Sequence, residues 1–491
     1  METGSIGSKI VTQMKEAYLV IDIGTGNARV AVIAPDGEIL GIRIEDVQYH
    51  KDNLYPDSIY FEPSYLWQQI RQMSMQILAS ANCEIIAVTA TSQREGIVLV
   101  DDKGEALIGL PNIDHRGREW ENLMNDKTAI YQKTGRYPTS LFSALKIVGI
   151  QKRRPEIAEK TALVLSISDW VEYAFSGVPH FEHSHASETL LYDVQNQKWC
   201  DELCGIFGIQ SSILAPLVAS GQILGKIKPE KAVEFGINPN AMVVVGGADT
   251  QLAAKSTQPS ANDVIIVSGT TTPIIKISES YEIDAAQRTW TGRHIEPNTF
   301  MVETNAGVTG LNYQRLKEVF YPNEPYEVME EELKAVDGSE CVASLGSLIA
   351  YEKTPILRGG FIFDVPVSHT LKRADFVFAT MWDIACCIKE NYDCLHEVSP
   401  HHKDYVLACG GGVQSRRLRQ MIANLIGKKV VICDTYRQSS SVGGALICNG
   451  ALSKPQMKRV VQEETAPNPL AKDQENYESW KKTRKSFRER S

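Results

Sequence analysis

The sequence predicts an α/β protein of two domains in which the second half repeats the layout of the first. Residues 18–33 have the pattern of a strand, a turn rich in glycine and threonine, and a second strand. Residues 263–278 follow the same order, with similarity in pattern and not in identity. The length of 491 residues also exceeds that of one ordinary domain. Two such hairpins facing each other would enclose the phosphates of a nucleotide in a cleft between the domains.

The composition is that of an ordinary globular protein, with 43% hydrophobic and 23% charged residues. A net charge of −9 argues against nucleic acid or an anionic membrane as the main partner. The sequence contains no membrane-spanning apolar run, and residues 1–15 lack the apolar core and cleavage site of a secretory signal. The ten cysteines form no CxxC pair, so we expect reduced, mostly buried thiols in a cytoplasmic protein.

In the first half, short apolar runs separated by turns predict the elements. The turn Gly24-Thr25-Gly26-Asn27 could open a dinucleotide fingerprint, but Arg29 replaces its third glycine and a strand follows where that motif needs a helix. This pattern excludes a dehydrogenase. We expect strands at 18–22, 28–33, 38–44, 84–89 and 97–100, an amphipathic helix at 63–81, and helices at 166–175 and 199–207.

In the second half, the same signals predict alternating strands and helices. Residues 280–300 are polar and are expected to form a loop region. Residues 473–491 are charged and are expected to form a terminal helix with a frayed end. The other expected elements are strands at 243–245, 264–267, 405–409 and 429–432, and helices at 309–320, 327–336, 376–398, 414–425 and 439–449.

The stretch 242–273 contains the strongest candidate for catalysis. Its first strand leads through two glycines to Asp249 at the expected start of a helix, and its second strand ends in the hydroxyl-rich turn 268–272. A carboxylate beside a loop of N–H and O–H donors suits phosphoryl transfer, because one end orients a hydroxyl and the other holds the phosphate. The helix N-terminus should keep the pKa of Asp249 low. Taken alone, Asp249 is better explained as a helix cap.

A cluster of histidines follows the helix expected at 166–175. His180, His183 and His185 lie close enough in sequence to bind a metal ion together. The alternative is a solvated loop, which we favour for so loose a spacing.

Five motifs, in this order, resemble those of the FGGY family of carbohydrate kinases. The resemblance covers the chain from Tyr18 to about Leu452 and implies a two-domain actin/hexokinase-like (ribonuclease H-like) duplicated fold with an interdomain cleft. It implies an N-terminal domain at 16–256 for substrate, phosphate and the catalytic base, a C-terminal domain at 257–470 for nucleotide, and a charged helix at 471–491. The motifs are DIGTGNAR (22–29), SQREG (92–96), GGADTQ (246–251), SGTTT (268–272) and ACGGGVQSRR (408–417).

Three further segments are most similar to the autoinducer-2 kinases: SQREGIVLV (92–100), NIDHRGRE (112–119) and ISDWVEYAFSG (167–177). The resemblance implies ATP-dependent phosphorylation of a hydroxyl on a small carbohydrate or polyol, with an autoinducer-2 type signal molecule as one candidate. A ketose, a pentitol or a non-catalytic ATP-binding switch are the alternatives. The chain departs from the family at Gln438, where glutamate is usual, and at Thr271, where serine is more typical.

By this resemblance, Asp249 is the catalytic base, ATP and Mg²⁺ are the cofactors, and Asp22 faces Mg²⁺ through water. The residues expected to contact the substrate are Gln93, Arg94, Glu95, Asp114, Asp249 and Gln251. The residues expected to hold ATP and its phosphates are Asp22, Gly24, Thr25, Gly26, Asn27, Arg29, Gly269, Thr270, Thr271, Gly307, Gly410, Gly411, Gly412, Gln414 and Ser415.

Each of these roles has a structural alternative. Arg94 and Glu95 would donate to and accept from neighbouring substrate hydroxyls, or else form a surface ion pair of little energetic value. Asp22 could be a turn residue, and the glycines at 410–412 an ordinary strand-to-helix turn. The identity of the substrate, the hydroxyl that is phosphorylated and the oligomeric state, including a homodimer, remain open.

Overall fold

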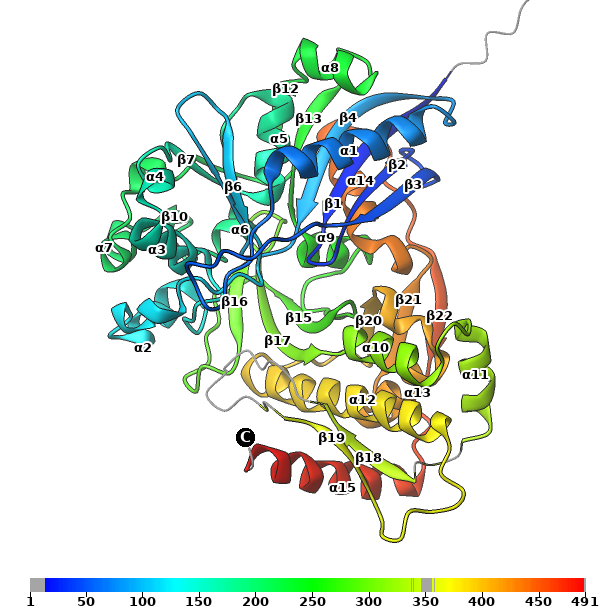
Figure 1. Ribbon diagram of the computed structural model, residues 1–491. Coiled ribbons are helices and arrows are strands. Elements are labelled where there is room, and N and C mark those ends of the chain that lie inside the picture. The colour runs from blue at the N-terminus through cyan, green and yellow to red at the C-terminus, as the bar shows by residue number, and fades with distance from the viewer. Residues whose placement is uncertain (1–13, 337, 339, 346–355, 357, 490–491) are drawn as a thin grey trace, which may run out of the picture.

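The computed structural model describes residues 14–336, 338, 340–345, 356 and 358–489. Residues 1–13, most of the stretch where no secretory signal is expected, lie outside this part. Two lobes, each built around a sheet, lie one above the other in Figure 1, with helix α9 (Asp249–Ser256) between them. This arrangement confirms the predicted duplicated α/β fold. Within the described residues, none of the helices combines the length and the apolar character that a membrane crossing requires.

The first sheet has six strands in the order β12-β13-β4-β1-β2-β3. Its centre is the predicted hairpin of β1 and β2, which pair antiparallel, while β4 runs parallel to both β1 and β13. The outer strands β3 and β12 are antiparallel to their neighbours. The strands are β1 (Lys15–Ile23), β2 (Asn27–Ile33), β3 (Ile39–Asp46), β4 (Cys83–Ser92), β12 (Ile223–Lys226) and β13 (Met242–Ala248).

The second sheet repeats this topology. Its order is β16-β17-β15-β14-β20-β21-β22, in which β14 and β15 form the second predicted hairpin and β20 and β21 run parallel to β14. The internal duplication therefore extends beyond the two hairpins to every strand of the first sheet. The strands are β14 (Val264–Val267), β15 (Thr271–Ser278), β16 (Trp290–Arg293), β17 (Phe300–Val308), β20 (Tyr405–Cys409), β21 (Lys429–Cys433) and β22 (Val461–Thr465).

Helices cover both sheets, and smaller sheets complete the first lobe and the base of the second (Figure 1). The helices are α1 (Pro63–Leu78), α2 (Lys127–Thr134), α3 (Ser143–Arg153), α4 (Pro155–Ala158), α5 (Ile167–Ser176), α6 (His183–Ala186), α7 (Asp201–Phe207), α8 (Pro229–Phe235), α10 (Gly310–Phe320), α11 (Tyr326–Lys334), α12 (Arg373–Val398), α13 (Arg416–Ile426), α14 (Ser439–Ala451) and α15 (Ala471–Arg488). The remaining strands are β5 (Ile97–Val100), β6 (Ala106–Leu110), β7 (Leu163–Ser166), β8 (Phe181–Glu182), β9 (Tyr192–Asp193), β10 (Lys198–Trp199), β11 (Leu217–Val218), β18 (Cys341–Ser344) and β19 (Gly360–Phe363).

Helix α14 comes late in the chain but packs on the first sheet. Its Val442 and Leu446 lie in one buried apolar cluster with Tyr18 and Val20 of β1. Tyr18 also donates a hydrogen bond of 2.7 Å from its hydroxyl to Asn449 of α14. The domain boundary at 256/257 stays a prediction, and α14 belongs structurally with the strands before that boundary.

The expectation of a loop region at 280–300 is correct for 280–289 and 294–299 but wrong at 290–293, where β16 lies, and at Phe300, the first residue of β17. The two strands pair antiparallel and face the first half of the chain. The backbone N–H of Thr291 donates to Gly135 and that of Arg293 donates to Ser187. Their polar side chains are buried against this partner surface, so the strands lack the alternation of apolar and polar residues that marks a half-exposed strand.

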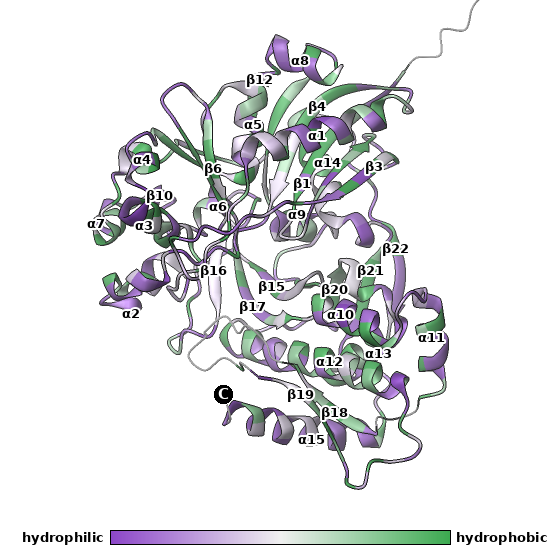
Figure 2. Cartoon of the chain, viewed as in Figure 1, coloured by the Kyte–Doolittle hydropathy of each residue, from purple (hydrophilic) through white to green (hydrophobic). Residues whose placement is uncertain are grey.

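The predicted terminal helix is present, and the last residues of its expected frayed end, 490–491, lie outside the described residues. Helix α15 is largely hydrophilic (Figure 2). Its Trp480 is nevertheless fully buried, stacks on Tyr477 and donates from Nε1 to Asp383 of α12 at 2.7 Å. The helix is therefore anchored on the second lobe as far as Arg488.

The cysteines agree with the expectation of buried thiols. All ten lie among the described residues, none of them is in a disulfide, and nine are buried. Cys394 is half-buried.

Candidate active site

A cavity of about 340 Å³ lies between the two hairpins and contains the predicted base. Its size is within the range of small-ligand sites. It brings together groups from both halves of the chain, as the duplicated pattern predicts. The lining residues include Asp22, Gly24, Thr25, Gly26, Asn27 and Arg29 from the first hairpin, Ser268, Gly269, Thr270 and Thr271 from the second, and Arg94, Glu95, Asn112, Asp249, Thr250, Gly410, Gly411 and Ser440.

The glycines around this cavity serve two different purposes. A Cβ built on Gly26 would meet no atom within 4 Å, and one on Gly269 would meet its nearest atom at 3.8 Å, so both backbones face open space that a ligand could occupy. Gly410 and Gly412 instead pack on the second hairpin, because a Cβ on either would lie 2.3 or 2.1 Å from Ser268. Of the predicted glycine turn, Gly411 is the residue whose backbone is open to the cavity.

Asp249 occupies the first turn of α9, with Ala248 at the N-cap position, so the interpretation of Asp249 as the helix cap is wrong. Its Oδ1 accepts hydrogen bonds from the N–H and the hydroxyl of Thr250 at 2.6 and 3.1 Å. Burial raises the pKa of Asp249 to about 6, and the negative charge of Asp22 acts in the same direction. The expectation of a low pKa is wrong, because desolvation outweighs the attraction of Arg94 and of the Thr250 donors.

Asp22 is the penultimate residue of β1 and is 5% exposed, so it is a strand residue and not a turn residue. Its Oδ2 accepts a hydrogen bond from Arg29 Nη1 at 3.0 Å and one from the hydroxyl of Ser440 at 2.5 Å. Oδ1 has no hydrogen-bond partner among the described residues. The carboxylate is therefore fixed at one oxygen and open at the other.

The SQREG segment is buried, which contradicts the alternative of a surface ion pair. Arg94 and Glu95 are 8% and 6% exposed. Arg94 binds Glu303 of β17 through Nη1 at 2.5 Å and Nη2 at 2.9 Å. Gln93 accepts a hydrogen bond from the N–H of Asn112 and donates to the carbonyl of Gly24. It therefore stabilises the turn of the first hairpin.

Glu95 is the unusual member of this segment. Its φ of +60° lies in the left-handed region, a strained conformation for a residue with a side chain. Within the described part of the chain, its carboxyl group has neither a hydrogen bond nor an ion pair. Burial raises the pKa of Glu95 to about 8, and the charge of Glu188 adds to this effect. A strained, unpaired carboxyl group lining the cavity is what a substrate contact requires.

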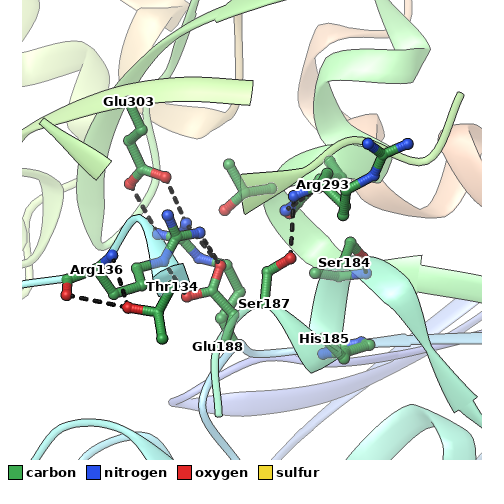
Figure 3. A network of polar contacts seen from close by, with 12 residues as sticks. Thr134, Arg136, Ser184, His185, Ser187, Glu188, Arg293 and Glu303 are labelled. Atoms are coloured by element: carbon green, nitrogen blue, oxygen red, sulfur yellow. Dashed lines mark hydrogen bonds and ion pairs between the residues drawn. The ribbon is translucent and has the colours of Figure 1, made fainter. Parts of the chain in front are cut away.

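Figure 3 shows a network of polar contacts that includes Arg136, Glu188 and Glu303. Glu188 accepts from Nε and Nη2 of Arg136 at 2.8 and 2.5 Å and lies 3.7 Å from Nη1 of Arg94. The guanidinium of Arg136 also lies over the ring of Trp290, 5.5 Å from its centroid. The network joins residues that follow β4, α2 and α6 in the first half to β16 and β17 of the second.

Four of the predicted site residues, Gln93 among them, line neither this cavity nor the larger one described below. Asp114 is fully buried and accepts hydrogen bonds from Arg116 at 2.7 Å and from the N–H of Ile59 at 2.9 Å. Gln251 is also fully buried and points to the carbonyl of Arg293. Gly307 lies in β17, away from the cavity lining.

A larger cavity of about 1190 Å³ adjoins the first on the second lobe. Gln414 and Ser415, both predicted to lie near the base of a nucleotide, line it. Two buried donors in its wall, Trp382 Nε1 and the hydroxyl of Tyr313, have no partner among the described residues. The cavity therefore combines apolar surface with unpaired donors. Residues common to both cavities are Gly269, Thr270, Gly411 and Arg437.

Arg437 is a site residue that the sequence did not predict. Its Nε donates to the hydroxyl of Tyr436 at 2.8 Å, and its two terminal nitrogens have no partner in the described part of the chain. The other arginines lining the smaller cavity, Arg29 and Arg94, are each paired with a carboxylate. The signal that could have identified Arg437 is its position directly before Gln438, where the motif departs from the family pattern.

The expectation of a solvated histidine loop is wrong. His180 and His185 are buried, and each of the three histidines has its own partner: Glu172 for His180, the Tyr192 hydroxyl for His183, and Ser168 for His185. They do not come together as a metal site.

His180 instead lies within reach of two carboxylates, Asp169 and Glu172. Burial lowers its pKa, but hydrogen bonds to both carboxylates outweigh burial and raise the pKa to about 11. The remaining oxygens of the carboxylates accept backbone N–H groups of Ala90, Gly246 and Glu182. With its donors and acceptors already paired, this cluster holds β4 and β13 in place beneath the site.

Comparison with known proteins agrees with the family resemblance seen in the sequence motifs. Residues 17–255 match the N-terminal domain, and residues 265–452 the C-terminal domain, of the FGGY family of carbohydrate kinases. The Bacillus subtilis (strain 168) protein named "Putative sugar kinase YoaC" is 50% identical over 476 residues, covering 96% of this chain and 98% of that protein. The autoinducer-2 kinase of Salmonella typhimurium is 24% identical over 463 residues, covering 89% and 86%. The crystal structure of Plasmodium falciparum glycerol kinase with ADP superposes with a TM-score of 0.84 at 18% identity, covering 96% and 98%.

Proposed function

The chain belongs to the FGGY family of carbohydrate kinases, and we propose that it transfers the terminal phosphoryl group of ATP to a hydroxyl of a small polyhydroxylated substrate bound beside Asp249. The observation that carries this assignment is the smaller cavity, which is lined by both hairpins and by Asp249. The open backbones of the first hairpin and of Gly269 suit the phosphates. The adjoining larger cavity has the size for an adenosine group.

In this mechanism Asp249 orients the attacking hydroxyl and accepts its proton. The transition state of phosphoryl transfer is loose, so positioning contributes more than base strength. A pKa of about 6 still helps, because the carboxylate is charged at neutral pH and is more basic than an ordinary aspartate. On the substrate side, Arg94 donates to one hydroxyl and Glu95 accepts from its neighbour.

The carboxylates also fit a magnesium site. Asp22 has one oxygen free, and it lines the same cavity as Asp249. Carboxylate oxygens with room for water are the donors that Mg²⁺ prefers. Asp22 would hold the ion through water, and the bound ion would offset the charge on the phosphates.

For the substrate, a small carbohydrate or polyol is the proposed class. An autoinducer-2 type signal molecule is one candidate within it, supported by the 24% identity to the autoinducer-2 kinase. A ketose or a pentitol is the alternative. We expect the enzyme to act in the cytoplasm, where its ten thiols would stay reduced.

The test is a coupled assay of ADP release with the purified protein, Mg²⁺ and ATP, over a panel of polyols, ketoses and a linear pentanedione-type signal molecule. We expect turnover with at least one member, and loss of that turnover in Asp249→Asn. A folded protein that binds ATP but phosphorylates none of the panel would contradict the proposal.

A further inference from the structure

We propose that Glu303 makes the acceptor site selective for uncharged polyhydroxylated substrates over sugar acids, by neutralising Arg94 from behind. The inference rests on the proposed kinase function and identifies the charge class of its substrate. Glu303 itself does not line the cavity. It acts through Arg94, which does, and is therefore a specificity-determining residue and not a catalytic one.

The first step of the argument is geometric. An arginine recognises a carboxylate through two parallel N–H donors, either the pair at the end of its guanidinium or the pair formed by Nε and one terminal nitrogen. In Arg94 both terminal nitrogens already bind Glu303, at 2.5 and 2.9 Å. Each terminal nitrogen carries a second N–H, which can still donate to an uncharged hydroxyl. Glu303 thus occupies the end-on donor pair and neutralises the guanidinium there, while the second N–H groups remain for uncharged hydroxyls.

The second step concerns charge. Glu188 lies 3.7 Å from Arg94 and is already paired with Arg136 (Figure 3). The substrate side of the cavity also presents the carboxyl groups of Glu95 and Asp249. An acidic substrate would therefore meet the Asp249 carboxylate, while Arg94 on the substrate side is already paired with Glu303.

The other two arginines that line the cavity do not offset the negative charge that an acidic substrate would meet. Arg29 is paired with Asp22. Arg437 has free terminal nitrogens, but it lines the larger cavity as well and so faces the nucleotide side. A buried like-charge contact costs enough to reject a ligand.

The third step is the placement of Glu303. It is fully buried, and it comes from β17 of the second lobe, whereas Arg94 follows β4 of the first. A purely structural ion pair between the lobes would stabilise their contact without affecting the charge preference of the site. The two roles can therefore be separated by measuring selectivity.

The experiment compares substrates that differ in charge and little else. For each of several configurations of five and six carbons, kcat/KM is measured with Mg²⁺-ATP for the aldonate, its neutral aldonamide and the alditol. With the wild-type enzyme, we expect the best neutral compound to exceed its matched acid by about tenfold or more. In Glu303→Gln, which keeps the shape and removes the charge, we expect this ratio to fall by about tenfold.

Two variants serve as controls. Glu303→Asp keeps the charge and should keep the wild-type ratio. Asp383→Asn removes a buried carboxylate that binds Trp480, in the second lobe and outside the linings of both cavities, and should leave the ratio unchanged.

The ratio is internal to each enzyme, so partial loss of stability does not affect it. A wild-type enzyme that uses the acids as well as their amides would overturn the inference even if Glu303→Gln failed to fold. An unchanged ratio in a folded Glu303→Gln would overturn it as well. If the wild type binds ATP but phosphorylates no compound of any charge, the kinase proposal itself fails and this inference fails with it.

Discussion

Replacing Asp249 with asparagine should remove catalysis and at the same time stabilise the fold. Asparagine keeps an oxygen that can accept the hydrogen bonds from Thr250, so the local geometry should persist. Loss of a positioned acid–base group lowers kcat by about a thousandfold or more. ATP binding should stay within about twofold, because the hairpins that hold the phosphates are untouched.

The gain in stability follows from the pKa. The pKa of Asp249 rises from 3.8 to about 6 on folding, about two units. At about 1.4 kcal/mol per unit, holding the charged carboxylate in the folded state costs up to about 3 kcal/mol. The side chain is partly exposed, so solvent reduces this figure, and we expect Asp249→Asn to raise the free energy of unfolding at pH 7.5 by about 1–3 kcal/mol.

The sign of the pH dependence is fixed by the direction of the shift. The folded pKa is raised, so the cost is fully present above pH 6 and absent below the unfolded value of 3.8. The free energies of unfolding of wild type and variant should therefore converge as the pH falls from 7 to below 4. Urea unfolding followed by tryptophan fluorescence across this range measures the difference directly.

Two results would refute this reasoning. Near-normal turnover in the folded variant would remove Asp249 from the mechanism. A difference in unfolding free energy that stays constant from pH 7 to pH 4 would show that desolvation of the carboxylate is not its origin. Asp383→Asn, which lies outside both cavities, is the control for turnover and should keep kcat within about twofold.

Three further predictions follow from the site. The kcat of the wild type should fall as the pH drops through about 6, because the Asp249 base becomes protonated; a pH–rate profile that is flat between pH 5 and 8 would contradict this. Arg437→Gln should weaken ATP binding by about tenfold and leave adenosine binding unchanged, since the free guanidinium lies between the two cavities; calorimetric titration with both ligands measures the contrast, and equal losses for the two would refute the phosphate contact. Substrate and a non-hydrolysable ATP analogue together should close the lobes by hinge motion, and small-angle scattering without compaction would count against closure.

The sequence predicts this fold well where the pattern of apolar residues is local. Both hairpins, the strand leading to Asp249 and the glycine turn at 410–412 lie where the alternation of strands and turns indicates. The pairing of Arg94 with Glu303 could not be predicted, because the two residues are 209 positions apart and β17 has no regular alternation.

The wrong predictions at single residues also arise from surroundings that only the folded chain creates. The pKa of Asp249 depends on how much water the folded chain removes from it, which propensity does not describe. His180 and His185 are polar in sequence but buried in the structure, because each finds a partner from another segment. Such partners cannot be predicted from the residues that neighbour the histidines in the sequence.

The crossing of α14 onto the first sheet has a consequence for biosynthesis. During synthesis from the N-terminus, the face of the sheet formed by Tyr18 and Val20 stays uncovered until Val442 and Leu446 have left the ribosome. The first lobe therefore cannot complete its core while the second is still being made. A nascent chain halted at the boundary between the two halves would present an apolar sheet face to the chaperones of the cell, and both lobes reach their final packing together, after nearly the whole chain has been translated.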